Sequence, residues 1–103
     1  MDKRKAISIA KKFVNILPGE YKVRKAFLFG SFAKGNAHKD SDVDVALILS
    51  GSFNTFDMRI KLMRIRRDVD LTIEPHPIAE NEFNNSNPLV CEILKYGIPL
   101  NLK

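Results

Sequence analysis

Two aspartates separated by one residue are the side chains of this sequence whose type and spacing suit chemistry. Asp42 and Asp44 open the segment D-V-D-V-A-L-I-L. Successive side chains of a β-strand point to opposite faces, so both carboxylates are expected on one face and Val43 and Val45 on the other. Two acids on one face repel each other, and Mg²⁺ relieves this repulsion because it binds one or two carboxylates together with substrate phosphates. The alternative is that both acids only solvate the start of a strand.

A glycine turn precedes these aspartates. The apolar run from Ala26 to Phe29 stops at Gly30, as a buried strand that enters a turn would. Gly30 and Ser31 leave the backbone free of steric restriction, and exposed amide groups in such a turn can cradle phosphate oxygens. Lys34 lies in the same turn and is a candidate phosphate contact, with a solvated lysine as the alternative. The turn and the two acids together indicate a site for a phosphorylated substrate and a metal ion.

The segment V-D-L-T-I supplies a candidate third carboxylate, Asp70. We predict a strand over Val69–Glu74, in which Asp70 lies between apolar neighbours that give an acid no structural purpose. Asp68 has the same strand parity and is the rival, but it follows two arginines and can simply pair with them. Three aspartates and a phosphate-binding turn suit two-metal phosphoryl chemistry, in which the ions stabilise the attacking and leaving oxygens.

The pattern G-S-F-A-K-G followed by S-D-V-D resembles the signature of the nucleotidyltransferase superfamily typified by DNA polymerase beta. The closest resemblance is to its smallest members, the minimal nucleotidyltransferases, which are often paired with HEPN-domain proteins in toxin–antitoxin modules. The segment V-D-L-T-I is similar to the strand that carries the third acid of this family. The closing I-L-K-Y-G-I-P-L is similar to the usual end of its minimal members, so the likeness spans nearly the whole chain.

The resemblance implies a Mg²⁺-dependent enzyme whose two metal ions are held by Asp42, Asp44 and Asp70. Its substrate would be a nucleoside triphosphate, with ATP expected, whose phosphates lie against Gly30 and Ser31. Attack at the α-phosphorus would release pyrophosphate and move a nucleoside monophosphate to a hydroxyl of a partner protein. The expected role is that of an antitoxin beside a HEPN-domain protein. Two alternatives stay open: transfer to a small molecule such as an aminoglycoside, and a non-catalytic module that neutralises a partner by contact.

Local signals predict the first and last elements of the chain. A helix is expected from the N-cap Asp2 to just before Pro18, followed by a strand over 21–29. Another helix is expected to begin with Asn87 as N-cap and Pro88 at its first position, and to stop at Gly97 after Tyr96. An extended tail, I-P-L, then follows.

The middle of the chain predicts a helix over 54–67. Its buried stripe is expected to be Phe56, Ile60 and Met63, which recur at i, i+4 and i+7. The next strand is expected to stop at the segment P-H-P, which places His76 in an extended surface turn without a chemical role.

These elements predict an α+β fold in two layers, with helices on one face of a small mixed β-sheet. By resemblance this is the nucleotidyltransferase fold. The opposite face would carry the three aspartates and remain open, which is the pattern of an active-site groove. The 103 residues suffice for one domain with a modest core, so we expect a single nucleotidyltransferase domain over 1–103.

Composition narrows the setting. No apolar run approaches membrane-spanning length, and the start M-D-K-R-K lacks the apolar segment of a signal peptide. A single cysteine, Cys91, excludes an internal disulfide and fits a reducing compartment. We therefore expect a cytoplasmic protein without a membrane partner.

Basic residues outnumber acidic ones, 17 to 12, which gives a net charge of +5. This balance favours polyanionic partners: triphosphates, nucleic acid or an acidic protein surface. The excess is concentrated in residues 1–25 and 59–67. Solvated helix faces are the alternative explanation for both segments, and nucleic acid is a partner that we do not favour.

Overall fold

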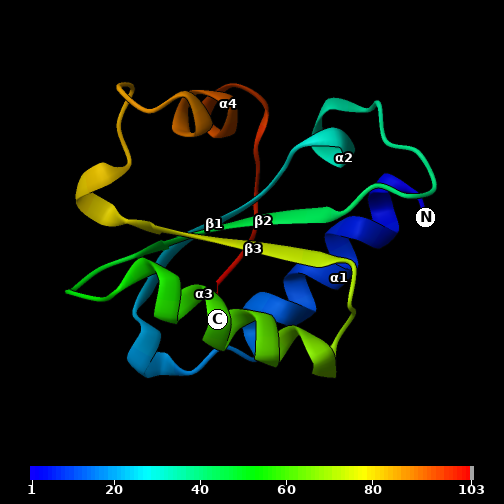
Figure 1. Cartoon of the computed structure of the whole chain (residues 1–103). Coiled ribbons are helices and arrows are strands. Elements are labelled where there is room, and N and C mark those ends of the chain that lie inside the picture. The colour runs from blue at the N-terminus through cyan, green and yellow to red at the C-terminus, as the bar shows by residue number, and fades with distance from the viewer. Residues whose placement is uncertain (103) are drawn as a thin grey trace.

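The structure, a computed structural model, describes residues 1–102 and consists of a sheet with helices on both of its sides (Figure 1). The longer elements are, in chain order, α1 (Lys3–Asn15), β1 (Val23–Phe29), α2 (Ser31–Lys34), β2 (Val43–Leu49), α3 (Thr55–Ile65), β3 (Ile73–Ala79), α4 (Pro88–Tyr96) and β4 (Ile98–Pro99). Short 3₁₀ turns lie between them: η1 (Gly19–Tyr21), η2 (Arg66–Asp68) and η3 (Glu80–Glu82). Within this described part, no helix is both long and apolar enough to cross a membrane.

The sheet has the strand order β3-β2-β1-β4. Strand β1 is antiparallel to both β2 and β4, whereas β2 and β3 are parallel. Parallel neighbours need a crossover connection, and α3 supplies it here. The mixed sheet confirms the expected α+β class, and the extended tail after α4 is the short edge strand β4.

The larger core lies between the sheet and the two helices α1 and α3 (Figure 1). Alternate residues of β2, beginning with Val43, point into it together with Ala26 and Leu28 of β1. The helix α1 starts where the sequence predicts, because the Asp2 side chain accepts a hydrogen bond from the Lys5 amide at 2.8 Å. Its apolar side adds the buried residues Ala6, Ile9, Ala10, Phe13 and Val14.

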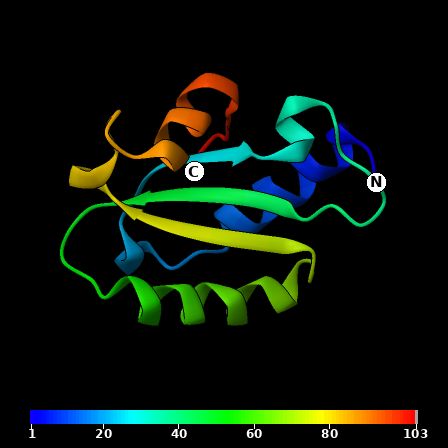
Figure 2. The same ribbon diagram turned by 45° about the horizontal axis from the view of Figure 1, so that its top comes forward.

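A second, smaller core lies on the other face of the sheet, under α4 (Figure 2). The expectation of helices on one face therefore holds for α1 and α3 but not for α4. The apolar side of α4 packs on strand residues that point away from the larger core. This second core consists of Phe29, Ala46, Ile48, Ile78, Val90 and Ile93. The ends of α4 are as predicted, with Asn87 accepting from the Leu89 amide at 2.9 Å and Gly97 following the last turn.

The helix α3 turns a different side to the sheet from the one predicted. Met58 and Leu62 are its buried residues, whereas Phe56 is 71% exposed and Ile60 is 37% exposed. Two residues correspond to about 200° of helix rotation, so the predicted stripe and the real one lie on opposite sides. The helix satisfies i, i+4 apolar spacing twice, and only contact with the sheet decides which stripe is buried.

The third strand also differs from the prediction. It begins at Ile73, after the predicted start at Val69, and it continues through Pro75 and Pro77. The two prolines are tolerated because β3 is an edge strand that pairs only with β2. The two prolines are two residues apart, so their backbone nitrogens point to the same side of the strand. We assign that side to the unpaired edge of β3, away from β2. Their rings are buried, so the P-H-P segment extends the strand and does not stop it.

Candidate functional site

Strand pairing brings the glycine turn and two acids together. In the antiparallel pair Phe29 lies opposite Asp44, and in the parallel pair Asp44 lies opposite Glu74. Gly30 directly follows Phe29 and so lies beside the Asp44 carboxylate. The side chains of Asp44 and Glu74 are both half-buried and project from the face that carries α4. Neighbouring strands therefore gather this site from three separate segments.

Gly30 is held in a conformation that only glycine adopts readily, with φ of 75°. A Cβ atom at this position would lie 2.3 Å from Oδ2 of Asp44. The absence of a side chain thus lets the backbone of the turn approach the carboxylate directly. Such an approach is what a site needs if phosphate oxygens and a metal-binding carboxylate are to meet at one point.

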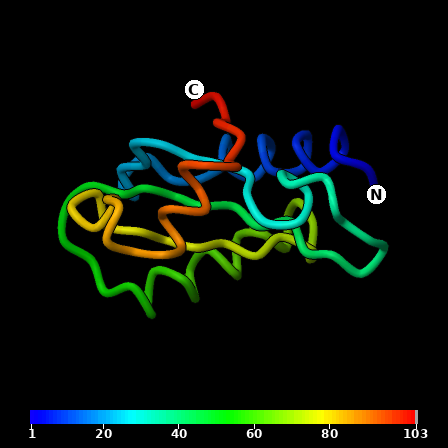
Figure 3. Tube along the Cα trace, turned by 90° about the horizontal axis from the view of Figure 1, so that it is seen from above, coloured from blue at the N-terminus to red at the C-terminus, as the bar shows by residue number. Residues whose placement is uncertain are grey.

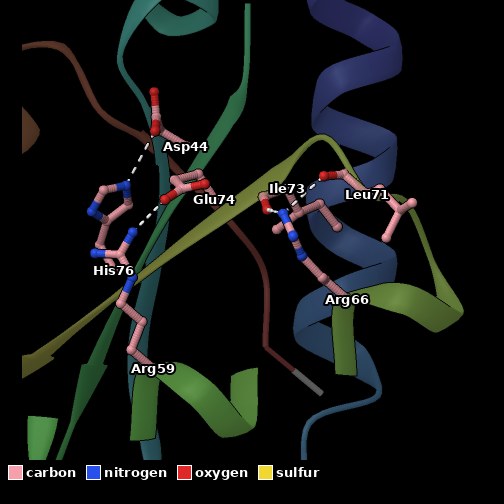
Figure 4. A network of polar contacts seen from close by, with 7 residues as sticks. All are labelled: Asp44, Arg59, Arg66, Leu71, Ile73, Glu74 and His76. Carbon is pink, nitrogen blue, oxygen red and sulfur yellow. Dashed lines mark hydrogen bonds and ion pairs between the residues drawn. The ribbon is translucent and has the colours of Figure 1, made fainter. Parts of the chain in front are cut away.

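His76 belongs to this site, although the sequence analysis gave it no role. Its Nε2 lies 3.1 Å from Oδ1 of Asp44 (Figure 4). Its ring packs edge-on against Phe29 at a centroid distance of 4.9 Å. One oxygen of the Asp44 carboxylate is therefore held by His76, and the other lies close to the Gly30 backbone. The missed signal was the alternation I-E-P-H-P-I, in which His76 shares the parity of Glu74 once the prolines are accepted in a strand.

Glu74 is the second residue that the sequence analysis missed. Arg59 of α3 reaches the edge of the sheet and forms an ion pair with it (Figure 4). Asp44 and Glu74, which lie opposite each other on β2 and β3, thus each contact a nitrogen-bearing side chain: His76 contacts Asp44, and Arg59 contacts Glu74. The Arg59 guanidinium offsets part of the repulsion between the two carboxylates on adjacent strands.

Asp42 stands at the edge of this group. It immediately precedes β2, its side chain is exposed, and strand parity places it on the same face as Asp44. The backbone beside it is anchored, because the Val43 amide donates to the Thr72 carbonyl at 2.8 Å. The pair Asp42 and Asp44 is therefore where the sequence predicts it, at the start of a central strand.

Asp70 lies in the connection before β3 and not inside a strand. Its Oδ1 accepts hydrogen bonds from the Thr72 amide at 2.8 Å and from the Thr72 hydroxyl at 2.5 Å. These bonds, the hydroxyl first, lower the pKa of Asp70, with a smaller contribution from Lys5. The geometry is that of an aspartate that closes a turn. Its second carboxylate oxygen has no bond among the described residues.

Lys34 of α2 is engaged with α4. Its ammonium lies 2.7 Å from Oε1 of Glu92, which raises the pKa of Lys34, and 5.6 Å from the ring centre of Tyr96. This pair links the short helix after the glycine turn to α4, which covers the rest of the face. Figure 3 shows the backbone of both segments from above. Ser31, the first residue of α2, follows Gly30 and is half-buried.

The residues present fit a magnesium ion with substrate phosphates better than a closed metal centre. Within residues 1–102, no group of three or more acids, histidines or cysteines is arranged to hold a metal ion. The predicted set Asp42, Asp44 and Asp70 is therefore not gathered into one cluster. A Mg²⁺ ion is commonly held by one or two carboxylates plus phosphate oxygens, and Asp42 and Asp44 beside the Gly30 turn offer that donor set.

An open hollow of about 660 Å³ lies elsewhere. It is an open depression between the end of α1 and η2, on the side of the larger core. Asp68, the rival for the third carboxylate, lines it together with Lys12 and Asn15. This places Asp68 away from the acids that follow the glycine turn.

Comparison with known proteins supports the same description. Residues 11–100 match the family model described as "Polymerase beta, Nucleotidyltransferase". A "putative protein adenylyltransferase" of Methanocaldococcus jannaschii is 36% identical over 66 residues, which are 61% of this chain and 63% of that protein. The alignment thus spans less than two thirds of the relative's length.

Solved structures share the fold. The crystal structure of a "putative nucleotidyltransferase" from Sulfolobus solfataricus matches with a TM-score of 0.62 at 20% identity, over 94% of this chain and 80% of that one. A toxin–antitoxin structure with AMP-PNP matches with a TM-score of 0.53 at 19% identity, over 100% of this chain and 75% of that one. At such identities the likeness concerns the arrangement of the elements and not their chemistry.

Proposed function

Because this chain belongs to the polymerase beta nucleotidyltransferase family, which matches residues 11–100, we propose that it transfers a nucleoside monophosphate from a triphosphate to a hydroxyl. One observation carries the proposal: the Gly30 backbone lies directly against the Asp44 carboxylate at the open end of the sheet. A phosphate held by the turn would therefore meet a carboxylate suited to its metal ion.

The reaction forms one bond and breaks one. The acceptor oxygen attacks the α-phosphorus, the bond between the α-phosphorus and the bridging oxygen breaks, and pyrophosphate leaves. The proton of the hydroxyl passes to a carboxylate of the acidic face. In this scheme Gly30 and Ser31 orient the phosphates, and Lys34 neutralises charge on them when it exchanges Glu92 for substrate.

Asp42 and Asp44 are the residues that would hold Mg²⁺, with the substrate phosphates completing its oxygen ligands. When bound, the ion supplies charge stabilisation for the oxygens that gain negative charge during transfer. His76 holds Asp44 by one oxygen, which leaves the oxygen beside Gly30 directed at the turn. A second ion needs a further carboxylate, for which the sequence predicts Asp70 and the strand register favours Glu74.

ATP is the proposed substrate and a partner protein the proposed acceptor. The M. jannaschii relative is described as a protein adenylyltransferase, and one of the similar structures is a toxin–antitoxin with AMP-PNP. We extend both features to this chain, with a HEPN-domain protein as the partner and the cytoplasm as the place where ATP and Mg²⁺ are available. The small domain offers little surface to enclose a small-molecule acceptor, which favours a protein acceptor.

The test is transfer of label from two forms of ATP. The protein is incubated with Mg²⁺, the product of a neighbouring HEPN gene, and ATP labelled on either the α- or the γ-phosphate. Label from the α-phosphate should become protein-bound, label from the γ-phosphate should not, and Asp44→Asn should abolish the transfer. Label on an added aminoglycoside would support the small-molecule alternative. A stable complex without any transfer would support the non-catalytic one.

A further inference from the structure

The outward side of α3 carries apolar side chains that the fold does not use. Phe56 and Ile60, with the half-buried Met63, form a row with i, i+4, i+7 spacing, which we call the outer stripe. Met58 and Leu62 already supply the contact between α3 and the sheet. A phenylalanine that is 71% exposed gains little from folding, and Ile60 also stays 37% exposed, so packing within the chain accounts for only part of the outer stripe.

The outer stripe is bordered by positive charge. Between Thr55 and Asp68 the chain has five basic and two acidic side chains. Arg64 and Arg67 are exposed, and within residues 1–102 neither forms an ion pair with a carboxylate. An apolar row with basic borders is complementary to an apolar partner surface with acidic borders.

Two other occupants fit this surface less well. A second copy of the chain, docked by two-fold symmetry, would place two surfaces of the same net positive charge against each other, because this segment has five basic and two acidic side chains. A nucleic acid backbone would satisfy the arginines but would offer no apolar surface to Ile60 and Met63. An acidic protein partner satisfies both parts of the surface.

The outer stripe also borders the acidic face. Arg59, which lies one residue before Ile60, reaches around the edge strand β3 to Glu74 (Figure 4). A protein seated on the outer stripe would therefore extend along the edge of β3 toward Asp44 and the glycine turn. This is the position from which a partner can present a hydroxyl to the open carboxylates.

We propose that the outer stripe of α3 is the docking surface for the protein partner, which binds it through an apolar surface bordered by glutamates and aspartates. That the docked partner is also the acceptor rests on the proposed function. The outer stripe adds where this partner binds. Docking there is separate from nucleotide binding, because Phe56, Ile60, Arg64 and Arg67 do not belong to the candidate site.

The test uses two synthetic helical peptides of about 18 residues, which is about five helical turns. Both carry leucines at the spacing of one helix face and a fluorescent label, and they differ only in glutamate or lysine at the polar positions. Fluorescence anisotropy with the full chain should show binding of the glutamate peptide. The lysine peptide should bind at least tenfold more weakly, and raising the salt from about 0.01 M to about 0.15 M should weaken the glutamate peptide severalfold.

Three double variants locate the binding. Phe56→Ala with Ile60→Ala, and Arg64→Glu with Arg67→Glu, should each weaken the glutamate peptide at least tenfold without lowering Tm. The matched control is Leu94→Ala with Lys95→Glu, which removes an exposed leucine and a neighbouring lysine from α4 and should leave the affinity unchanged. Binding of Mg-ATP, measured by calorimetry, should be the same in wild type and all three variants.

Several results would overturn the inference. If the α4 control lost as much affinity for the glutamate peptide as the α3 variants, or if the lysine peptide bound equally well, the binding would be nonspecific. Tighter binding of a single-stranded oligonucleotide to the same arginines would assign the surface to nucleic acid. Sedimentation that shows a dimer broken by the Phe56 variant would assign it to a second copy. A chain that binds the glutamate peptide through α3 but neither binds nor transfers nucleotide would leave docking in place and refute the proposed function.

Discussion

The sheet face that carries α4 has two halves that share the same strands but differ in chemistry. In one half, Ala46 and Ile48 of β2 and Ile78 of β3 lie under α4 in a small apolar core. In the other half, Asp44, Glu74 and His76 occupy the preceding positions of the same strands without a helix over them. The boundary falls between Asp44 and Ala46, a step of two residues.

The difference shows two ways of stabilising one surface. The covered half is stabilised by burial of apolar side chains against α4. The open half is held by polar contacts, a hydrogen bond between His76 and Asp44 and an ion pair between Arg59 and Glu74. Such exposed pairs add little to folding stability and can be exchanged for ligands, so the open half is free to bind a substrate.

The largest expected effect comes from neutralising the open half. Asp44→Asn should lower nucleotide transfer by about 10⁴-fold, roughly 5 kcal/mol, because it removes the carboxylate that faces the glycine turn. Thermal unfolding should be unchanged, since Asp44 is only half-buried and asparagine can keep the one side-chain hydrogen bond that Asp44 makes within residues 1–102, the bond to His76. Transfer at the wild-type rate with Mg-ATP would remove Asp44 from the site.

The next effect comes from carrying an acid into the covered half. Ala46→Asp, two residues along the same strand, should lower the free energy of unfolding by about 3 to 5 kcal/mol, because Ala46 is fully buried under α4 and His76, its register partner, already contacts Asp44. Urea denaturation measures it. The matched control, Asp44→Ala, should change the stability by less than about 1 kcal/mol. Equal losses at the two positions would mean that the halves do not differ as described.

A smaller effect separates the two candidates for the third carboxylate. If Glu74 completes the open half, Glu74→Gln should slow single-turnover transfer by about 10²-fold with little change in Mg-ATP affinity, while Asp70→Asn should not. The strand register, which places Glu74 opposite Asp44, is the reason for this order. Collapse of transfer in Asp70→Asn alone would restore the assignment that the sequence predicts, with a loop movement bringing Asp70 to the site.

The smallest effect concerns pH. The pKa of Asp70 is lowered in the folded chain by Thr72, so this contact stabilises the fold above the unfolded pKa of about 3.9 and the stabilisation is lost as pH falls through the folded pKa. Thr72→Val should lower the free energy of unfolding by about 1 kcal/mol near neutral pH. Urea titrations should show the gap narrowing between about pH 5 and about pH 2. A gap that is independent of pH would contradict the role of the charged carboxylate.

Much of the fold could be predicted because its signals are local. The caps at Asp2 and Asn87 each bind an amide within three residues, so no distant part of the chain is needed to specify them. The common face of Asp42 and Asp44 could also be predicted, because residues two apart in a strand lie on the same face whatever the neighbouring strands are. The missed site residues, Glu74 and His76, share the same parity rule. His76 was missed because two prolines made its segment look like a turn. Glu74 lay at the end of the predicted strand, but Asp70 was preferred as the third carboxylate.

The sequence by itself determined most of the helices and strands, and that a glycine turn and two acids lie near each other in a family-specific pattern. Tertiary structure decided between alternatives that these local signals do not distinguish. Only the edge position of β3 allows Pro75 and Pro77 within a strand, because no partner needs their missing amides. Only contact with the sheet chooses Met58 and Leu62 over Phe56 and Ile60, since both pairs have the same helical spacing. Only the register of β2 against β3 places Glu74 and His76 around Asp44, because hydrogen bonds between strands depend on residues about thirty positions apart.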